Sequence, residues 1–224
     1  MKYARAFVFL NGEINHPEKL LAMLNAEVYL VAVDGGLRHL LALNMKPHIL
    51  IGDLDSVHPA ELKWAQEQGI PIVQLPVKKD ETDLEAALQH IIELGILDIV
   101  LLAAIGNRID HTLANIFILT KPDFNKHSIR IWDGNQEISV ITESMDIFGN
   151  KGDLLSLLPL SERVLGVTTE GLEYPLEHEA LYVWNARGVS NVMSSHHANV
   201  TVLEGNLLCI HFKSMNGQEK ENLL

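Results

Sequence analysis

A short segment, GDLDS at residues 52–56, combines residue types that could hold a metal ion. Asp53 and Asp55 flank one leucine directly after the apolar run HILIG. Along extended backbone, residues i and i+2 project to the same side, so both carboxylates could chelate one hard cation. Mg²⁺ prefers one or two carboxylates together with substrate phosphates and water. The alternative is a solvated turn in which Asp55 or Ser56 caps the helix that follows near Pro59. The segment alone leaves both interpretations open.

A second motif, Asp34-Gly35-Gly36, lies between the apolar run VYLVAV and a helical pattern. Glycines at such a position let the backbone approach a phosphate, and the N-terminus of a helix favours an anion. An aspartate that simply caps the helix explains the same residues, and the three residues alone favour this simpler explanation.

The segment VKKDETD, residues 77–83, places two lysines beside acids in an otherwise acidic chain. Lys78 and Lys79 could present ammonium groups to phosphates, while Asp80 and Asp83 could face a metal ion. Solvated lysines and a first-turn acid that complements the helix dipole would account for the same residues.

The segment GNRIDH, residues 106–111, offers a different set of groups. Gly106 allows a tight turn, Arg108 could clamp a phosphate through its planar fork, and Asp110 could orient Arg108. Asp110 is equally explained as the cap of the next helix. Each motif therefore has a simple structural explanation, but all four follow successive apolar runs. In parallel α/β sheets, ligands bind beyond the carboxyl ends of the strands. Together the motifs predict a site for Mg²⁺ and a polyphosphate, where catalysis is mainly positioning and charge neutralisation.

The first half of the chain alternates short apolar runs with helical patterns, which predicts a parallel sheet with crossover helices. The runs are rich in Val, Ile and Leu, as expected for strands covered on both faces. The predicted strands span 4–10, 28–33, 48–52, 70–75 and 98–105, and the predicted helices span 17–26, 36–44, 59–69, 83–94 and 110–120. Thr82 and Glu85 fit a capping box for the helix over 83–94, and Gly95 is placed to end it.

After about residue 125 the chain consists of short apolar runs broken by Gly, Pro, Asn and Ser. The segment SIRIWDGNQEISVI predicts two strands around a tight turn at Asp133-Gly134-Asn135. No long amphipathic helix is expected in this half, as in small antiparallel sandwiches and barrels. We therefore predict an α/β domain with a mainly parallel sheet at 1–125 and an all-β antiparallel sandwich or barrel domain at 126–224.

Composition limits the classes of partner. With 29 acidic and 17 basic residues, the formal net charge is −12, so nucleic acid and anionic membrane surfaces are not expected partners. The single cysteine, Cys209, excludes a disulfide framework and reads as a buried apolar residue. No apolar run approaches the roughly 18 residues of a membrane span. These features predict a cytoplasmic protein.

Taken in order, the motifs resemble those of thiamine pyrophosphokinases. The matching elements are DGG (34–36), GDLDS (52–56), KDETD (79–83), GNRIDH (106–111), TTEGLEYPL (168–176) and GVSN (188–191). The resemblance implies an α/β nucleotide-binding domain followed by a β domain. It also implies that the protein transfers a pyrophosphoryl group from ATP to the hydroxyl of thiamine, giving thiamine diphosphate and AMP. A homodimer that holds thiamine between its subunits is implied as well.

Carried over by position, the resemblance implies a role for each motif. Asp53, Asp55 and Asp83 would hold Mg²⁺, and with Lys79 they form the predicted catalytic set. Asp55 would also steer the proton of the hydroxyl. The residues predicted around ATP are Asp34, Gly35, Gly36, Lys78, Lys79, Asp80, Gly106, Arg108 and Asp110. Ser190 and Asn191, which the residues alone would favour as a plain turn, would contact thiamine.

The prediction is therefore a thiamine diphosphokinase, with three alternatives. A pyrophosphokinase for another small alcohol, such as a hydroxymethylpterin, would share the ATP site but not the motifs in the second half. A non-catalytic thiamine or nucleotide sensor could lose the metal carboxylates, yet all of them are present. A glycosyltransferase with a DxD metal site would give no role to Lys79, Arg108 or the β domain.

Overall fold

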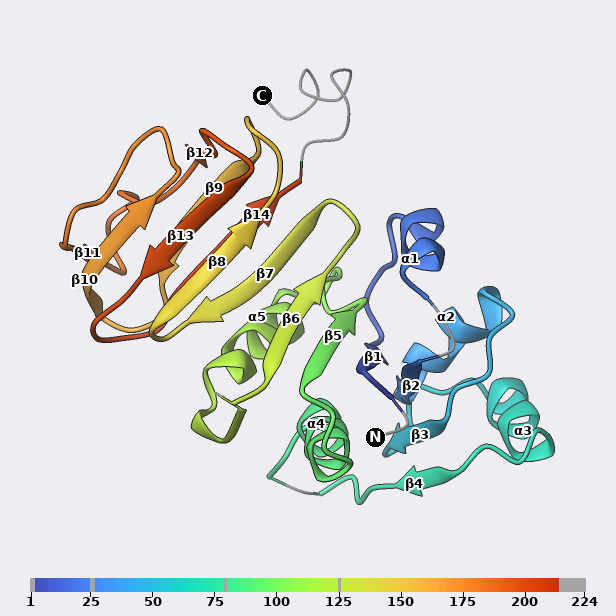
Figure 1. Ribbon diagram of the computed structural model, residues 1–224. Coiled ribbons are helices and arrows are strands. Elements are labelled where there is room, and N and C mark those ends of the chain that lie inside the picture. The colour runs from blue at the N-terminus through green and yellow to red at the C-terminus, as the bar shows by residue number, and fades with distance from the viewer. Residues whose placement is uncertain (1–2, 25–26, 79, 125, 214–224) are drawn as a thin grey trace. The chain divides into compact units, whose positions relative to one another are not determined.

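The computed structural model describes residues 3–24, 27–78, 80–124 and 126–213 (Figure 1). The chain divides into two compact units between Gly134 and Asn135. Each unit has a hydrophobic core of its own.

Strands β1 to β6 form a parallel sheet in the first unit. Their order across the sheet is β4-β3-β2-β1-β5-β6, and neighbours run in the same direction. The strands are β1 (Arg5–Phe9), β2 (Val28–Val33), β3 (Ile49–Gly52), β4 (Ile72–Gln74), β5 (Asp98–Leu102) and β6 (Ser128–Trp132). β1, β2, β3 and β5 are almost wholly buried, as their continuous apolar sequences predict.

The direction in which the chain adds strands reverses beside β1. β2, β3 and β4 extend the sheet on one side of β1, whereas β5 and β6 lie on the other. Phe9, at the end of β1, has Ala32 of β2 and Leu102 of β5 as its partners. Open α/β sheets bind ligands outside the carboxyl ends of the strands at such a reversal.

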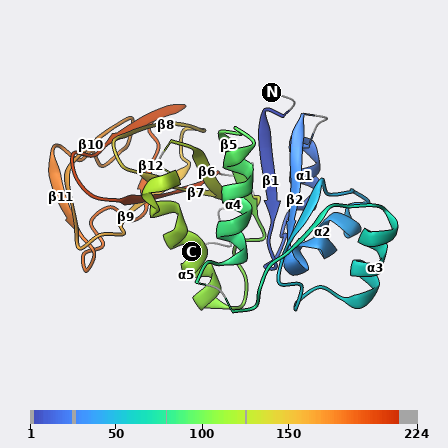
Figure 2. The same ribbon diagram turned by 90° about the horizontal axis from the view of Figure 1, so that it is seen from below.

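Helices cover both faces of this sheet. The helices of the first unit are α1 (Pro17–Met23), α2 (Leu37–Ala42), α3 (Pro59–Glu67), α4 (Asp83–Glu93) and α5 (Ile109–Phe117). Figure 2 shows α1, α2 and α3 on one side of β1 and β2, with α4 on the other. Right-handed crossovers account for this, because the connection from β4 to β5 runs back across the sheet and must use the opposite face.

The second unit consists of two antiparallel sheets. Their strand orders are β12-β9-β14-β7 and β11-β10-β13-β8. The strands are β7 (Gln136–Ile141), β8 (Ser144–Phe148), β9 (Leu154–Pro159), β10 (Arg163–Glu170), β11 (Glu179–Tyr182), β12 (Asn191–Val192), β13 (His197–Thr201) and β14 (Leu207–Phe212). Residues of both sheets make up the core of this unit. The predicted fold class, a parallel α/β region followed by an antiparallel β region, is confirmed.

Two helix starts test the local predictions. α4 begins at Asp83 after Thr82, whose Oγ1 accepts the Glu85 N–H at 3.2 Å, which is the Thr82 half of the predicted capping box; the Glu85 carboxylate pairs with Lys121 instead. Neither Asp55 nor Ser56 caps α3: the cap is His58, whose Nδ1 accepts the Ala60 N–H while Glu61 accepts the His58 N–H. Pro59 explains this, because proline favours the first helical position and makes the preceding residue the cap.

The division of the chain falls later than expected. β6 pairs in parallel with β5, so it lies in the first unit, and the break follows Gly134 rather than residue 125. Among the described helices, none is both long and apolar enough to cross a membrane.

Candidate active site

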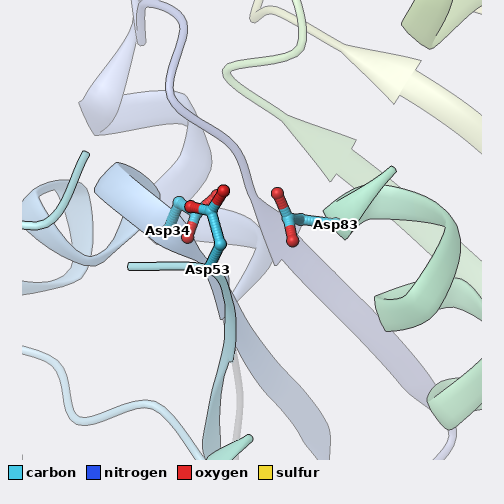
Figure 3. Close-up of side chains that lie close together, drawn as sticks. All are labelled: Asp34, Asp53 and Asp83. Carbon is cyan, nitrogen blue, oxygen red and sulfur yellow. The ribbon is translucent and has the colours of Figure 1, made fainter. Parts of the chain in front are cut away.

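Three carboxylates converge at the carboxyl ends of neighbouring strands (Figure 3). Asp34 follows β2, Asp53 follows β3, and Asp83 is the first residue of α4. Each offers an oxygen atom that lies within 4.8 Å of the others, and all three side chains are half-buried. Because the residues are 19 or more positions apart by number, only the strand order brings them together.

The Asp34 carboxylate is held by the GDLDS segment. Asp34 has left-handed backbone angles, with φ at 47°, and its Oδ1 accepts the Leu54 N–H at 2.9 Å. A Cβ on Gly52 would lie 1.9 Å from this oxygen, so only glycine fits there. The DGG and GDLDS motifs, which are separate in the sequence, are therefore joined in the structure by a hydrogen bond and close packing.

The glycines of the DGG motif let the backbone pack closely against the end of β1. A Cβ on Gly36 would lie 1.9 Å from the Phe9 carbonyl oxygen, and one on Gly35 would lie 2.5 Å from Asn11 Oδ1. Gly35 N–H also donates to Ser56 Oγ at 3.3 Å. Close packing thus gives both glycines a structural role, whatever their contact with a phosphate.

The pKa of Asp34 is strongly perturbed. Burial raises the pKa of Asp34 to about 7, and the hydrogen bond and negative charge of Asp83 and the charge of Asp53 act in the same direction. The Leu54 N–H opposes these effects. A bound cation would remove the repulsion, and a set of carboxylate oxygens is what Mg²⁺ or another hard cation prefers. The donor set therefore fits a divalent metal ion.

The assembled acids differ in one member from the predicted metal ligands. Asp53 and Asp83 belong to the group, but Asp34, expected near the phosphates, stands with them in the described geometry. Asp55 is exposed, and its N–H donates to Asp53 Oδ1 at 3.1 Å. Its role as a ligand stays a prediction. Because β2 and β3 are neighbours in the sheet, the residues that follow them lie side by side, and this reasoning could have added Asp34 to the predicted metal ligands.

The other charged residues predicted at the site, where the structure describes them, are exposed. Lys78 and Asp80 are exposed, and Lys79 lies outside the described residues. Arg108 donates to both carboxylate oxygens of Asp110, with 3.1 Å between Nε and Oδ1. These hydrogen bonds hold the pKa of Asp110 well below its ordinary value. Asp110 thus orients the guanidinium, as predicted, and it is not the cap of α5, which is Arg108.

A loop that the sequence reasoning missed follows β1, at the reversal of strand order. Gly12 N–H donates to the Ala103 carbonyl at 2.8 Å, and Glu13 N–H donates to the Ile105 carbonyl at 3.0 Å. A Cβ on Gly106 would lie 3.1 Å from the Gly12 Cα. Two glycines therefore face each other at the position where such sheets bind ligands. The signal was the Asn-Gly pair directly after a predicted strand.

The Asn11–Glu13 loop is also tied to α2. Arg38 Nη2 donates to the carbonyl oxygens of Asn11 and Gly12, each at 2.8 Å, and His39 Nε2 lies 3.0 Å from the Gly12 carbonyl. Asn107 Nδ2 donates to Glu13 Oε1 at 3.0 Å. These contacts hold the loop in a fixed backbone conformation.

In the second unit, Ser190 and Asn191 have different environments. Ser190 is exposed, has φ at 59°, and its N–H donates to Ser156 Oγ at 3.0 Å. Asn191 is buried, and its carboxamide accepts the Tyr174 N–H at 3.1 Å and donates to the Tyr174 carbonyl at 2.7 Å. Asn191 therefore fixes the backbone of the TTEGLEYPL segment, and of this pair only Ser190 is exposed.

Family models match both units. A model described as thiamin pyrophosphokinase, catalytic domain, matches residues 20–132, and one described as thiamin pyrophosphokinase, vitamin B1 binding domain, matches residues 136–207. The chain belongs to the thiamin pyrophosphokinase family. The two matches meet where the two compact units divide.

Individual members of the thiamin pyrophosphokinase family are similar at low identity. Thiamine pyrophosphokinase of Bacillus subtilis (strain 168) is 27% identical over 182 residues, which are 80% of this chain and 85% of that protein. Its crystal structure superposes with a TM-score of 0.83 at 25% identity, covering 94% of this chain and 100% of that one. Thiamin pyrophosphokinase from Candida albicans, at 18% identity, shares the fold with a TM-score of 0.80 over 95% of this chain and 90% of that one.

Family membership settles the class of activity. The chain is an enzyme, a transferase of the kinase type with thiamine pyrophosphokinase function, and its second unit is a thiamine-binding domain. The predicted resemblance and function are confirmed. A non-catalytic sensor and a glycosyltransferase are set aside as alternatives.

Proposed function

We propose that the chain binds ATP with Mg²⁺ at the carboxyl ends of β1, β2, β3 and β5 and transfers the pyrophosphoryl group to thiamine. A bond forms between the thiamine hydroxyl oxygen and the β-phosphorus. The bond from that phosphorus to the oxygen of the α-phosphate breaks, AMP leaves, and the hydroxyl proton is released. The convergence of Asp34, Asp53 and Asp83 at the end of the sheet is the observation that supports this reaction most directly.

Asp34, Asp53 and Asp83 would hold the metal ion in this proposal. Bound Mg²⁺ would neutralise charge on the phosphate oxygens and on the leaving AMP. Asp34 is held in place because its Oδ1 accepts the Leu54 N–H. Asp53 in turn accepts the Asp55 N–H, which ties the GDLDS turn together. A rigid set of acids needs little rearrangement when the ligand arrives.

Arg108 and the lysines would contact the phosphates. The Arg108 guanidinium is exposed and its Nε and Nη2 donate to Asp110, so it would receive phosphate oxygens on its Nη1–Nη2 edge. Lys78 is exposed beside the N-terminus of α4, and we assign Lys79 to the same task from its sequence position. Gly12 and Gly106 pack backbone against backbone where β1 and β5 end, and a phosphate or ribose would approach the sheet at this edge.

Thiamine would be bound by the second unit through Ser190 and the segment that Asn191 fixes. The substrate carries a permanent positive charge, which suits an acidic site in a chain of net charge −12. We assign Asp55 to orient the thiamine hydroxyl and accept its proton. Its exposed carboxylate is next to Asp53, within the same turn.

One assay tests the reaction. The protein is incubated with Mg²⁺, ATP and thiamine, and the nucleotide product is separated and identified. Thiamine-dependent AMP together with thiamine diphosphate supports the proposal. ADP in place of AMP would mean transfer of one phosphoryl group, and AMP formed with a hydroxymethylpterin but not with thiamine would identify a different alcohol substrate.

We further propose that the chain acts as a homodimer with thiamine between subunits, as the resemblance implies. The second unit carries exposed apolar side chains that suit an interface, since the Tyr182 and Trp184 rings stack at 5.2 Å and Trp184 is 70% exposed. Light scattering coupled to size-exclusion chromatography measures the mass directly. The proposal would be contradicted if the protein were a monomer at micromolar concentration and its activity per chain did not change with protein concentration.

A further inference from the structure

A buried His–Asp pair in the second unit has no part in the proposed chemistry. His211 of β14 is 4% exposed, and Asp153, just before β9, is fully buried. His211 Nε2 lies 3.0 Å from Asp153 Oδ2, and the same oxygen accepts the Asn150 N–H at 2.8 Å. Buried carboxylates are tolerated only where donors satisfy them, so this pair fixes the position of Asp153 closely.

The pair determines the shape of the turn at residues 149–153. Gly149 lies directly against it, because a Cβ there would be 2.6 Å from Asp153 Oδ2 and 2.7 Å from His211 Nε2. Asp153 N–H donates to the Asn150 carbonyl at 3.0 Å, which closes the turn. Moving either member of the pair therefore displaces the backbone of the turn.

This turn pairs with the segment that follows β12. Gly152 N–H donates to the Met193 carbonyl at 2.8 Å, and Met193 N–H donates to the Asp153 carbonyl at 2.9 Å. Gly149 N–H donates to the His196 carbonyl, and His196 Nδ1 lies near the Gly149 carbonyl, both at 3.1 Å. The turn thus holds the segment after β12 at two points, Met193 and His196.

The segment 191–194 pairs on its other side with residues 171–174. Glu173 N–H donates to the Val192 carbonyl and Ser194 N–H donates to the Gly171 carbonyl, each at 2.9 Å. Leu172 and Met193 form an antiparallel bridge between these bonds. Residues 191–194 therefore lie between the 149–153 turn and residues 171–174.

We propose that His211 is a positioning residue for thiamine binding. Through Asp153 and the 149–153 turn, it fixes residues 191–194 and, across the shared hydrogen bonds, residues 171–174. These are parts of the two segments assigned to thiamine, so the inference rests on the proposed function. His211 touches neither substrate nor metal and acts through backbone position alone.

The test compares His211→Asn with His211→Gln. The amide nitrogen of glutamine reaches the position of imidazole Nε2, whereas that of asparagine falls one methylene short. We expect His211→Asn to raise the KM for thiamine about tenfold or more, because small displacements of binding groups are costly. The KM for ATP and the kcat stay within about twofold, and His211→Gln recovers most of the thiamine affinity.

Cys209→Ala is the matched control. Cys209 lies two residues earlier on β14, on the same face and similarly buried, and it pairs with Ser139 and Leu157, which lie outside the turn. A merely structural role for His211 would lower the amount of active enzyme and hence kcat, with the KM for thiamine unchanged, as expected for Cys209→Ala. A KM for thiamine at the wild-type value in His211→Asn would overturn the inference, as would an equal rise in the KM for ATP.

A double variant covers the case in which His211→Asn does not fold. His211→Leu combined with Asp153→Ala removes the buried charge together with its partner, which folded proteins tolerate better than removal of one member. We expect the same rise in the KM for thiamine, and a wild-type KM would overturn the inference. Wild-type protein that forms no thiamine-dependent AMP would instead contradict the proposed function.

Discussion

The two units of this chain use polar side chains in opposite ways. Among the described residues, the buried polar side chain of the first unit is Thr112, whereas those of the second are Asp153, Ser156, Thr169, Asn191 and His211. In the first unit, the clustered acids Asp34, Asp53 and Asp83 stand half-buried at the edge of an apolar sheet. In the second, polar groups lie inside and bind one another or the backbone, as Thr169 Oγ1 does with the Leu176 N–H at 2.8 Å.

The difference separates two kinds of binding site. In the first unit the acids are unbalanced, because the negative charges of Asp53 and Asp83 lie beside Asp34, and a bound cation would offset them. In the second unit the polar side chains have partners within the protein, because Asn191 bonds to the Tyr174 backbone and His211 bonds to Asp153. Charge is the property to change in the first unit, and backbone position is the property to change in the second.

The largest effect is expected from Asp53→Asn, which changes charge alone. The asparagine oxygen can still accept the Asp55 N–H, so the turn is preserved while the metal site loses one of three charges. We expect turnover to fall about a thousandfold or more, with a melting temperature in the absence of Mg²⁺ no lower than that of the wild type. AMP formation and thermal unfolding measure the two quantities. The control is Glu67→Gln, which removes one negative charge from an exposed position of α3. Near-normal activity in Asp53→Asn would contradict the assignment of Asp53 to the metal ion.

Asn191→Ala and Ser190→Ala test backbone position in the second unit. Asn191→Ala leaves the Tyr174 N–H and carbonyl without their partner, so the free energy of unfolding should fall by about 2–3 kcal/mol. Ser190→Ala should change it by less than about 0.5 kcal/mol, because Ser190 is exposed. Its KM for thiamine should nevertheless rise. Urea unfolding measures the stability of each variant, and steady-state kinetics measure its KM for thiamine. If both variants were equally stable, Asn191 would not have the structural role assigned to it.

Metal binding should stabilise the protein through the first unit. At a Mg²⁺ concentration one hundred times its Kd, the free energy of unfolding should rise by about 2.7 kcal/mol. Thermal melts with and without MgCl₂, at matched ionic strength, measure the change. In Asp53→Asn the stabilisation should disappear, and an equal shift in that variant would show that Mg²⁺ acts elsewhere.

The smallest effect concerns the thiol inside the second unit. Burial raises the pKa of Cys209 from 9.0 to about 12, and the negative charge of Glu137 adds to the shift. The folded thiol should therefore be inert to thiol reagents at pH 8 and become reactive on unfolding. Since the unfolded thiol ionises first, its contribution to stability is complete below pH 9.0 and is lost as pH rises toward about 12. Cys209→Ala should lose less stability than the wild type as the pH rises from 9 toward 12, as measured by urea unfolding. An equal loss of stability in that variant would contradict the role of the thiol.

Local sequence determined the elements and much of the chemistry. β2 has the predicted limits and α4 ends within one residue of its predicted end, because apolar periodicity, the Thr82 cap and Gly95 act between residues close in the chain. The Arg108–Asp110 pair, two positions apart, was also predictable. The resemblance of the ordered motifs was enough to identify the family.

Only the tertiary structure decided which groups meet. Asp34 joins Asp53 and Asp83 because β2 and β3 are neighbours in the sheet, and strand order depends on contacts between distant residues. The loop at Gly12 faces Gly106 for the same reason, since β1 pairs with β5. His211 and Asp153 are far apart in the chain and lie in runs that read as ordinary strands. No local pattern marks such a pair, because its partner is set by the packing of the second unit.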